Sequence, residues 1–183
     1  THPDQRGEWE VKDGIIVGGK VGSYLFSDAS NFTDFHLRIQ AKINRGGDSG
    51  VFFRSPFAMR QGRTADSLRP AGGYEVELHR NPAHQLPTGS VWNAETSGPP
   101  KILIKAADLS LIEVDDWFTL EIVARSNHFI TKVNGTQTAE CDDPESKFQS
   151  GCIALQVLHP QTIVQFRKIE IKELPSIVPS KDA

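Results

Sequence analysis

Strict alternation of apolar and polar side chains is the feature that most constrains the fold of this chain. Residues 35–43 alternate without a break, and residues 74–79 and 118–125 repeat the pattern. A two-residue period is typical of a β-strand with one buried face. We find no convincing helical period over ten or more residues. The sequence therefore predicts a chain built from β-strands.

Turn signals indicate how these strands are connected. Asp13-Gly14 and Asn134-Gly135 each lie between two short runs with strand character. Both dipeptides suit the type I′ turn of a two-residue hairpin. The alternation changes phase within residues 164–171, which predicts a β-bulge near Arg167-Lys168. Many short strands with such turns favour an all-β fold, and at 183 residues we expect a two-sheet antiparallel jelly-roll sandwich.

Composition limits the domain organisation and the partners. We expect one domain over residues 1–174 and a tail or linker over residues 175–183, where two prolines interrupt any pattern. The chain has 20 Lys plus Arg against 23 Asp plus Glu and no basic block, so we expect no nucleic-acid partner. No apolar run approaches the roughly 20 residues of a membrane span. The chain starts at Thr1, so we expect a mature form or a piece excised from a protein with further domains.

The cysteine content argues against a disulfide framework and against a four-cysteine zinc site. Only Cys141 and Cys152 are present. They could form one disulfide or remain two small buried thiols, because sequence does not supply the geometry of a bond.

The best candidates for chemistry lie on one predicted strand. Glu75, Glu77 and His79 share a face, with successive side chains roughly 6.5 Å apart. Carboxyl groups that close raise each other's pKa, which suits proton transfer near neutral pH. The imidazole adds a base or a metal ligand. The same triplet also fits the solvated face of an edge strand.

Three other residue types could contact a ligand. Arg54 ends a predicted strand in which it faces the same way as Phe52, and its guanidinium could bind sugar hydroxyls or form a structural ion pair with Glu75. Trp92 could stack on a sugar ring, whereas we expect Trp9 and Trp117 in the core. His159 ends a strand and could point into a site or lie on the surface.

One long predicted loop is a further candidate. Residues 55–72 carry Arg60, Arg63 and Arg69. Loops of this length in a compact domain are often functional, although a solvated insertion is an equal alternative.

Taken in order, these landmarks resemble the 3-keto-disaccharide hydrolase family, bacterial proteins with a concanavalin A-like jelly roll. The resemblance spans Trp9 to Leu174 and rests on an ordered set of motifs: residues 9–14, 32–37, 48–54, 73–77, 88–90, 116–117, 133–135, 151–156 and 166–169. The chain departs from the family pattern at several of them. Asp48 replaces an Asn, Glu77 a Gln, His79 an acidic residue and Lys168 an Asn, and an extra residue precedes His159.

The resemblance implies a hydrolase of 3-keto-glycosides. A ketone at C3 of the sugar acidifies the hydrogen at C2, so that a base removes it, the glycosidic oxygen leaves C1, and water adds. Glu75 and Glu77 are the candidates for base and acid, and His159 for proton transfer. Arg54, or a divalent cation such as Ca²⁺, Mn²⁺ or Zn²⁺, would stabilise the enolate. The remaining candidates for substrate contact are Asp48, His79, Trp92 and Arg167.

Two alternatives remain. The chain could be a non-catalytic carbohydrate-binding or interaction module of a larger secreted protein, since the departures at Glu77, His79 and His159 also fit lost catalysis. A β-glucanase of the same fold is less consistent, because residues 75–80 lack the third acid of the Glu-x-Asp-x-x-Glu motif. In each case the resemblance implies a carbohydrate or keto-sugar ligand and an extracytoplasmic location, periplasmic or secreted.

Overall fold

The fold is a β-sandwich, described by a computed structural model over residues 8–19, 22–61, 68–79, 86–94, 101–107 and 111–175. These residues contain no helix. They form fifteen strands: β1 (Glu8–Lys12), β2 (Ile15–Gly19), β3 (Ser23–Phe26), β4 (Phe35–Ile43), β5 (Asp48–Ser55), β6 (Met59–Gln61), β7 (Leu68–Pro70), β8 (Tyr74–His79), β9 (Val91–Asn93), β10 (Lys101–Ile104), β11 (Phe118–Arg125), β12 (His128–Val133), β13 (Thr136–Asp142), β14 (Cys152–Val157) and β15 (Ile163–Glu173).

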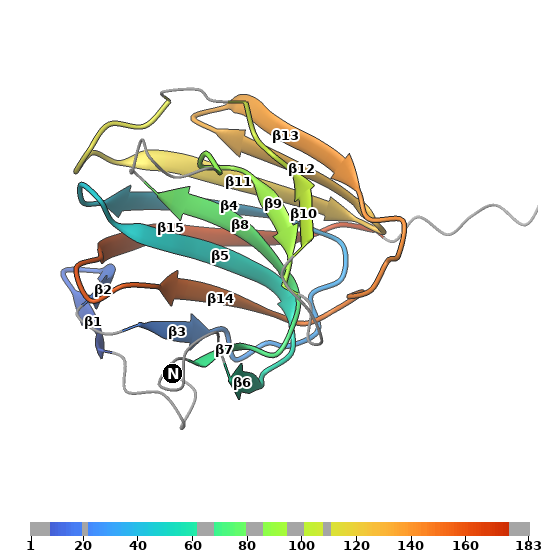
Figure 1. Cartoon of the computed structure of the whole chain (residues 1–183), viewed down its shortest axis with the longest axis horizontal. Coiled ribbons are helices and arrows are strands. Elements are labelled where there is room, and N and C mark those ends of the chain that lie inside the picture. The colour runs from blue at the N-terminus through green and yellow to red at the C-terminus, as the bar shows by residue number, and fades with distance from the viewer. Residues whose placement is uncertain are drawn as a thin grey trace, which may run out of the picture.

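The strands form two large sheets and one small hairpin (Figure 1). The seven-stranded sheet has the order β1-β2-β15-β4-β11-β12-β13, and the six-stranded sheet has the order β10-β9-β8-β5-β14-β3. Strands β6 and β7 pair only with each other. Every pairing is antiparallel, so the predicted all-β, two-sheet antiparallel sandwich is confirmed.

The predicted turns and the predicted bulge are also confirmed. Asp13 and Gly14 have φ values of 51° and 75°, and Asn134 and Gly135 have 50° and 80°. Positive φ at both central residues is what a type I′ turn requires. The register of β15 against β4 shifts between Arg167 and Glu170, where Lys168 has a φ of 49°.

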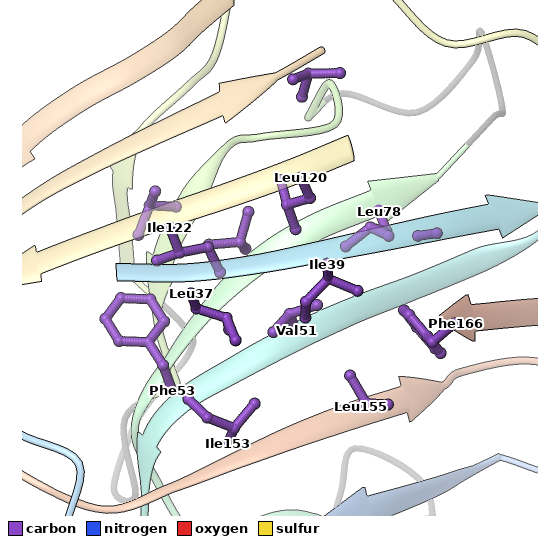
Figure 2. Close-up of a cluster of buried hydrophobic side chains, with 14 of the residues drawn as sticks. Leu37, Ile39, Val51, Phe53, Leu78, Leu120, Ile122, Ile153, Leu155 and Phe166 are labelled. Atoms are coloured by element: carbon purple, nitrogen blue, oxygen red, sulfur yellow. The ribbon is translucent and has the colours of Figure 1, made fainter. Parts of the chain in front are cut away.

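The core lies between the two large sheets (Figure 2). Alternate side chains of β4 and β11 meet alternate side chains of β5, β8 and β14, and Phe53, Tyr74 and Phe129 stack among them. Tyr74, Val76 and Leu78 of β8 are fully buried in this core. Because side chains alternate along a strand, Glu75, Glu77 and His79 must point to the opposite face of the six-stranded sheet. We call that face, which is turned away from the other sheet, the carboxylate face.

A second bulge corrects the predicted orientation of Arg54. Cys152 pairs with Ser55 and Ala154 pairs with Phe52, so β5 carries one extra residue at this point. Arg54 takes a φ of 49° and its guanidinium lies over the ring of Phe129, on the core side of the sheet. The prediction that Arg54 faces the same way as Phe52 is therefore wrong, because the bulge interrupts the alternation.

The guanidinium of Arg54 is buried there among hydrogen-bond acceptors. It donates to the backbone carbonyls of Thr33, Ser126 and Phe148 and pairs with Asp34 at 3.3 Å. An ion pair was expected, but its partner is Asp34 and not Glu75.

Of the remaining predictions for single residues, some are confirmed and one is wrong. Trp9 stacks against Phe166 at the edge of the core, as expected. Trp117 lies on the outer face of the seven-stranded sheet between Lys42 and Arg167, so its predicted place in the core is wrong.

Cys141 and Cys152 are not bonded to each other, and burial raises the pKa of Cys141 to about 12. Within the described segments, no helix has the length and hydropathy to cross a membrane.

Candidate functional site

An unbroken row of side chains crosses the carboxylate face. Each member pairs with its neighbour on the next strand, and adjacent strands are about 4.8 Å apart. From β3 to β10 the row consists of Phe26, Ala154, Phe52, Glu75, Trp92 and Ile102. Glu75 is therefore held between an aromatic side chain on each side.

A second, more polar row runs beside the first. Tyr24 pairs with Gln156, and Gly50 pairs with Glu77. Gly50 leaves a gap in this row, since a Cβ atom there would lie 2.3 Å from Oε1 of Glu75. The Glu75 carboxyl group therefore occupies the space that any other residue at position 50 would fill. Glu77, the register partner of Gly50, lies next to this point of the sheet.

The third row forms the rim of the site. Asp48 pairs with His79, and His159 follows the end of β14. Nε2 of His159 lies 3.5 Å from Oδ2 of Asp48, with 49% of the His159 side chain exposed. His79 is buried, and its Nε2 hydrogen bonds with the carbonyl oxygen of Leu86. His159 is thus accessible to solvent, whereas His79 is fixed by the backbone.

The two glutamates are not on the solvated face of an edge strand. Strand β8 lies between β9 and β5 inside the sheet, and Glu75 and Glu77 are only 5% and 2% exposed. The edge-strand alternative is therefore wrong. Burial of a carboxyl group disfavours its charged form, so both side chains are expected to hold protons at unusually high pH.

The pKa values of both carboxyl groups are raised, by causes that differ in part. Burial raises the pKa of Glu75, and the charges of Glu77 and Asp48 raise it further, while Arg69 and a hydrogen bond from Gln156 oppose the shift. Burial, and after it the charge of Asp48, raise the pKa of Glu77. One buried oxygen of Glu77 also has no hydrogen-bond partner among the described residues. Because the charge of Glu77 raises the pKa of Glu75, the first charge on this pair keeps the proton on the other carboxyl group.

Three residues of this site were not predicted as site residues. Tyr24 and Gln156 hydrogen bond to each other at 3.2 Å, and Gln156 also bonds to Glu75. Arg69 comes from β7, and its charge acts on both Glu75 and Tyr24. Strand alternation places Gln156 on the same face as Glu75 only once β14 is known to neighbour β5. No local pattern indicates that Arg69 returns to this sheet.

The other predicted residues lie in different places. Trp92 flanks Glu75, and its Nε1 atom is buried without a hydrogen-bond partner in the described part of the chain. Arg167 lies on the outer face of the other sheet, where it donates to Gln40 at 2.8 Å. Arg54 lies on the core side of its own sheet. The carboxylate face thus brings together Asp48, Glu75, Glu77, His79, Trp92 and His159, without Arg54 or Arg167.

A divalent cation finds no ready site in the described residues. Nowhere among them do three His, Cys, Asp or Glu side chains gather so that they could hold a metal ion. The acids of the carboxylate face lie on three separate rows, and His79 is bound to a backbone carbonyl. We therefore derive no chemical step through a cation from this geometry.

Comparison with solved structures identifies relatives in fold. Carbohydrate-binding module CBM66 from Bacillus subtilis is similar with a TM-score of 0.69 and 20% identity, over 91% of this chain and 92% of the module. A proposed glycosyl hydrolase from Parabacteroides distasonis is similar with a TM-score of 0.66 and 17% identity, over 91% and 90% of the two chains. A legume lectin-like domain from Entamoeba histolytica gives 0.69 and 12% identity, over 92% and 88%. At these identities the likeness establishes the sandwich fold.

Sequence comparison identifies the family. A search of curated protein sequences found no match. The family model described as "3-keto-alpha-glucoside-1,2-lyase-like domain" matches residues 1–172, nearly the whole chain. This match confirms the resemblance drawn from the ordered motifs and supports a carbohydrate-related function. The chain therefore belongs to the family of 3-keto-alpha-glucoside-1,2-lyase-like domains.

Proposed function

We propose that this protein hydrolyses 3-keto-glycosides, including 3-keto-disaccharides, by elimination followed by addition of water. The observation that carries the proposal is the pair of buried glutamates, Glu75 and Glu77, on one face of β8, where the charge of one favours the protonated form of the other. Such a pair supplies a base and an acid at one place. The family description names a 1,2-lyase, which is elimination across C1 and C2 of the sugar.

In the first step Glu75 acts as the base. Its carboxylate takes the proton from C2, and the electrons of the C–H bond form a C2–C3 double bond while the C3 oxygen becomes an enolate. Arg69 and Gln156 support this role, because both favour the ionised form of Glu75. The surrounding apolar side chains strengthen the interaction between the base and the acidic C–H group.

In the second step Glu77 acts as the acid. The enolate electrons return to re-form the C3 carbonyl, the C1–C2 double bond forms, and the glycosidic C1–O bond breaks. Glu77 gives its proton to the departing oxygen. Water then adds its oxygen to C1 and a proton returns to C2, so that the net reaction is hydrolysis. His159, exposed at the rim beside Asp48, is placed to exchange protons with solvent.

Trp92 and the rim residues would orient the sugar. The indole of Trp92 lies next to Glu75 and offers an apolar surface for a sugar ring. Asp48 accepts hydrogen bonds well and is 14% exposed. Both residues were expected to contact substrate, and their place beside Glu75 and Glu77 supports that role.

A non-catalytic carbohydrate-binding or interaction module is the second candidate, and the exposure pattern favours it. Phe57 and Ile102 are 54% and 52% exposed, Ile102 pairs with Trp92, and Phe57 packs on Phe26. Exposed apolar side chains at both ends of the first row could line a shallow surface for a glycan. In that case the buried glutamates would have no part in binding.

The test is release of the leaving group from a nitrophenyl 3-keto-glucoside by the whole chain. We expect release by the wild type and its loss in Glu75→Gln, with circular dichroism showing that the variant is folded. Assays with a chelator and with added Ca²⁺, Mn²⁺ or Zn²⁺ would decide whether the predicted cation takes part. Absence of release under all these conditions, from folded protein, would overturn the enzyme proposal, and a glycan array would then test the binding module. The extracytoplasmic location stays a prediction, to be tested by cell fractionation.

A further inference from the structure

Strand β15 has a free edge along its second half. Strand β2 pairs with it only from Ile163 to Phe166, whereas β4 follows it as far as Glu173. Figure 1 shows the β1–β2 hairpin beside one end of β15 only. Among the described residues, no strand pairs with residues 168–173 on the side of β2. Backbone groups left unpaired along such an edge are a template for a further strand.

The hydrogen bonds to β4 show which backbone groups lie on this edge. The amide of Leu174 donates to the carbonyl of Asp34, the residue before β4, at 2.8 Å. Along an antiparallel pair, every second residue directs both of its backbone groups to the same neighbour. The even-numbered residues of 170–174 therefore point theirs toward β4. The amide and carbonyl groups of Ile171 and Glu173 consequently point toward the free edge.

An apolar cavity of about 180 Å³ lies beside the same edge. It is located between the two sheets, where Ile169 and Ile171 line it together with side chains of β2, β3 and β14. Ile169 is 39% exposed. A strand added to the edge would cover these isoleucines and remove apolar surface from water. The edge therefore offers apolar contact in addition to backbone hydrogen bonds.

The charges on the outer face of this sheet alternate in sign toward the free edge. Glu121 of β11 pairs with Arg38 of β4, and Arg38 pairs with Glu170 of β15. In the next row but one along β15, Lys172 pairs with His36. Glu170 and Lys172 are both exposed and are the last members of their rows. Since opposite charges stabilise cross-strand pairs and like charges destabilise them, a strand that fits here carries a cation opposite Glu170 and an anion opposite Lys172.

We propose that residues 169–173 bind the same segment of a second copy of this chain, antiparallel and centred on Ile171. In this register Glu170 lies opposite Lys172 of the second copy, and two-fold symmetry repeats the pair on the other side of the axis. Ile171 lies opposite Ile171 of the second copy, so that their amides and carbonyls hydrogen bond to each other. The neighbouring registers that keep the isoleucines on the cavity side place Glu170 against Glu170, or Lys172 against Lys172. Charge therefore selects the register centred on Ile171.

The paired segment is short, because β2 occupies the edge as far as Phe166. Small interfaces are typically transient, so we expect a dimer with a dissociation constant of about 10–100 µM. The carboxylate face belongs to the other sheet and stays open in this dimer. The inference therefore does not depend on the proposed function.

Sedimentation velocity of the whole chain, from about 1 µM to about 1 mM, measures this dimer. Glu170→Lys places two lysines opposite each other in both symmetric pairs, and Lys172→Glu places two glutamates there. Each reversal should weaken dimerisation by at least about tenfold. The matched control is Glu10→Lys, an equal charge reversal at an exposed position of β1, the outermost strand of the same sheet. It should change the dissociation constant by less than about twofold.

A mixture of the two single variants tests the register itself. In the mixed dimer each lysine of the Glu170→Lys chain faces a glutamate of the Lys172→Glu chain, so dimerisation should return to the level of the wild type. A wild type that is monomeric at about 1 mM would overturn the inference. So would a dimer that neither reversal weakens, or folded single variants that remain monomeric when mixed. Circular dichroism checks folding, which these substitutions should preserve because both side chains are exposed.

Discussion

The two outward faces of the sandwich carry similar polar residues and use them in opposite ways. On the seven-stranded sheet the charges are partly exposed and paired: His36 with Glu121 at 2.8 Å, and Arg167 with Gln40 at 2.8 Å. On the carboxylate face the acids are buried and repel one another. The outer face of the seven-stranded sheet is an ordinary solvated surface, whereas the carboxylate face buries acidic side chains, which lowers the stability of the fold.

This difference identifies the functional face. Exposed ion pairs typically contribute about 0–1 kcal/mol to stability, so residues on the outer face of the seven-stranded sheet can be replaced at little cost in stability. Buried acids with strongly shifted pKa values are destabilising, and such groups are concentrated at functional sites. The comparison predicts that substitutions on one face change activity and stability strongly, and that matched substitutions on the other face do not.

The largest expected effect concerns the base. Glu75→Gln should lower the rate of leaving-group release by about 10²–10⁴-fold, because the amide cannot accept the C2 proton. The matched substitution on the opposite face, Glu121→Gln, should change the rate less than about twofold, since it removes only a partner of His36 on the sheet turned away from the site. Steady-state rates of both variants measure the contrast. Equal effects would remove the distinction between the faces.

The next largest effect concerns stability. Arg54→Met should lower the free energy of unfolding by about 3–5 kcal/mol, because it leaves Asp34 and three carbonyls buried without their donor. Arg167→Met should cost less than about 1 kcal/mol, because its contacts with Gln40 and Trp117 are partly solvated. Urea titrations followed by tryptophan fluorescence give both values. A cost for Arg54→Met below that for Arg167→Met would contradict the structure.

A smaller effect of opposite sign is expected at Glu77. Its folded-state pKa is raised, so the stability of the wild type is greatest below the unfolded pKa and falls as pH rises through the folded value. Glu77→Gln removes this penalty and should raise the free energy of unfolding by about 1–2 kcal/mol near pH 8, and by less near pH 5. Melting curves at the two pH values measure it. A destabilised variant at both would show that the carboxyl group is not under this penalty.

The smallest effect compares the two bulges. Lys168 is exposed and has a φ of 49°, a conformation that glycine adopts without strain. Lys168→Gly should stabilise the protein by about 0.5–1 kcal/mol, the usual cost of a left-handed residue with a Cβ atom. Arg54 has the same φ, but its side chain is needed there. Thermal melts of Lys168→Gly, with Lys172→Gly as a control in the regular part of β15, would detect the difference.

The sequence predicts what depends on local alternation. Residues 35–43, 74–79 and 118–125 are the strands β4, β8 and β11 without a change of boundary, and both I′ turns lie where expected. The burial of Glu75 and Glu77 could not be predicted, because it depends on β9 and β5, which flank β8 in the sheet. The orientation of Arg54 depends on a bulge in β5. The apolar and polar pattern of residues 48–54 has no change of phase that would predict this bulge.

For the site too, the sequence predicts only the residues that local strand geometry brings together. Glu75, Glu77 and His79 are two residues apart, and strand geometry alone places them on one face. Tyr24, Gln156 and Arg69 reach them from β3, β14 and β7, so only the tertiary pairing of distant segments brings them together. The family resemblance supplied the reaction class but placed Arg54 and Arg167 in the site, because a motif does not specify which face of a sheet its residues occupy.

The contacts of Arg54 also bear on how the chain folds. Its three carbonyl acceptors belong to residues 21, 72 and 94 positions away, in segments that join different strands of both sheets. A partly assembled sandwich that lacks any of these segments would enclose a cation with unmet donors, which is strongly unfavourable. Arg54 therefore disfavours such intermediates relative to the complete sandwich. We expect it to make unfolding a single cooperative transition in which the two sheets separate together.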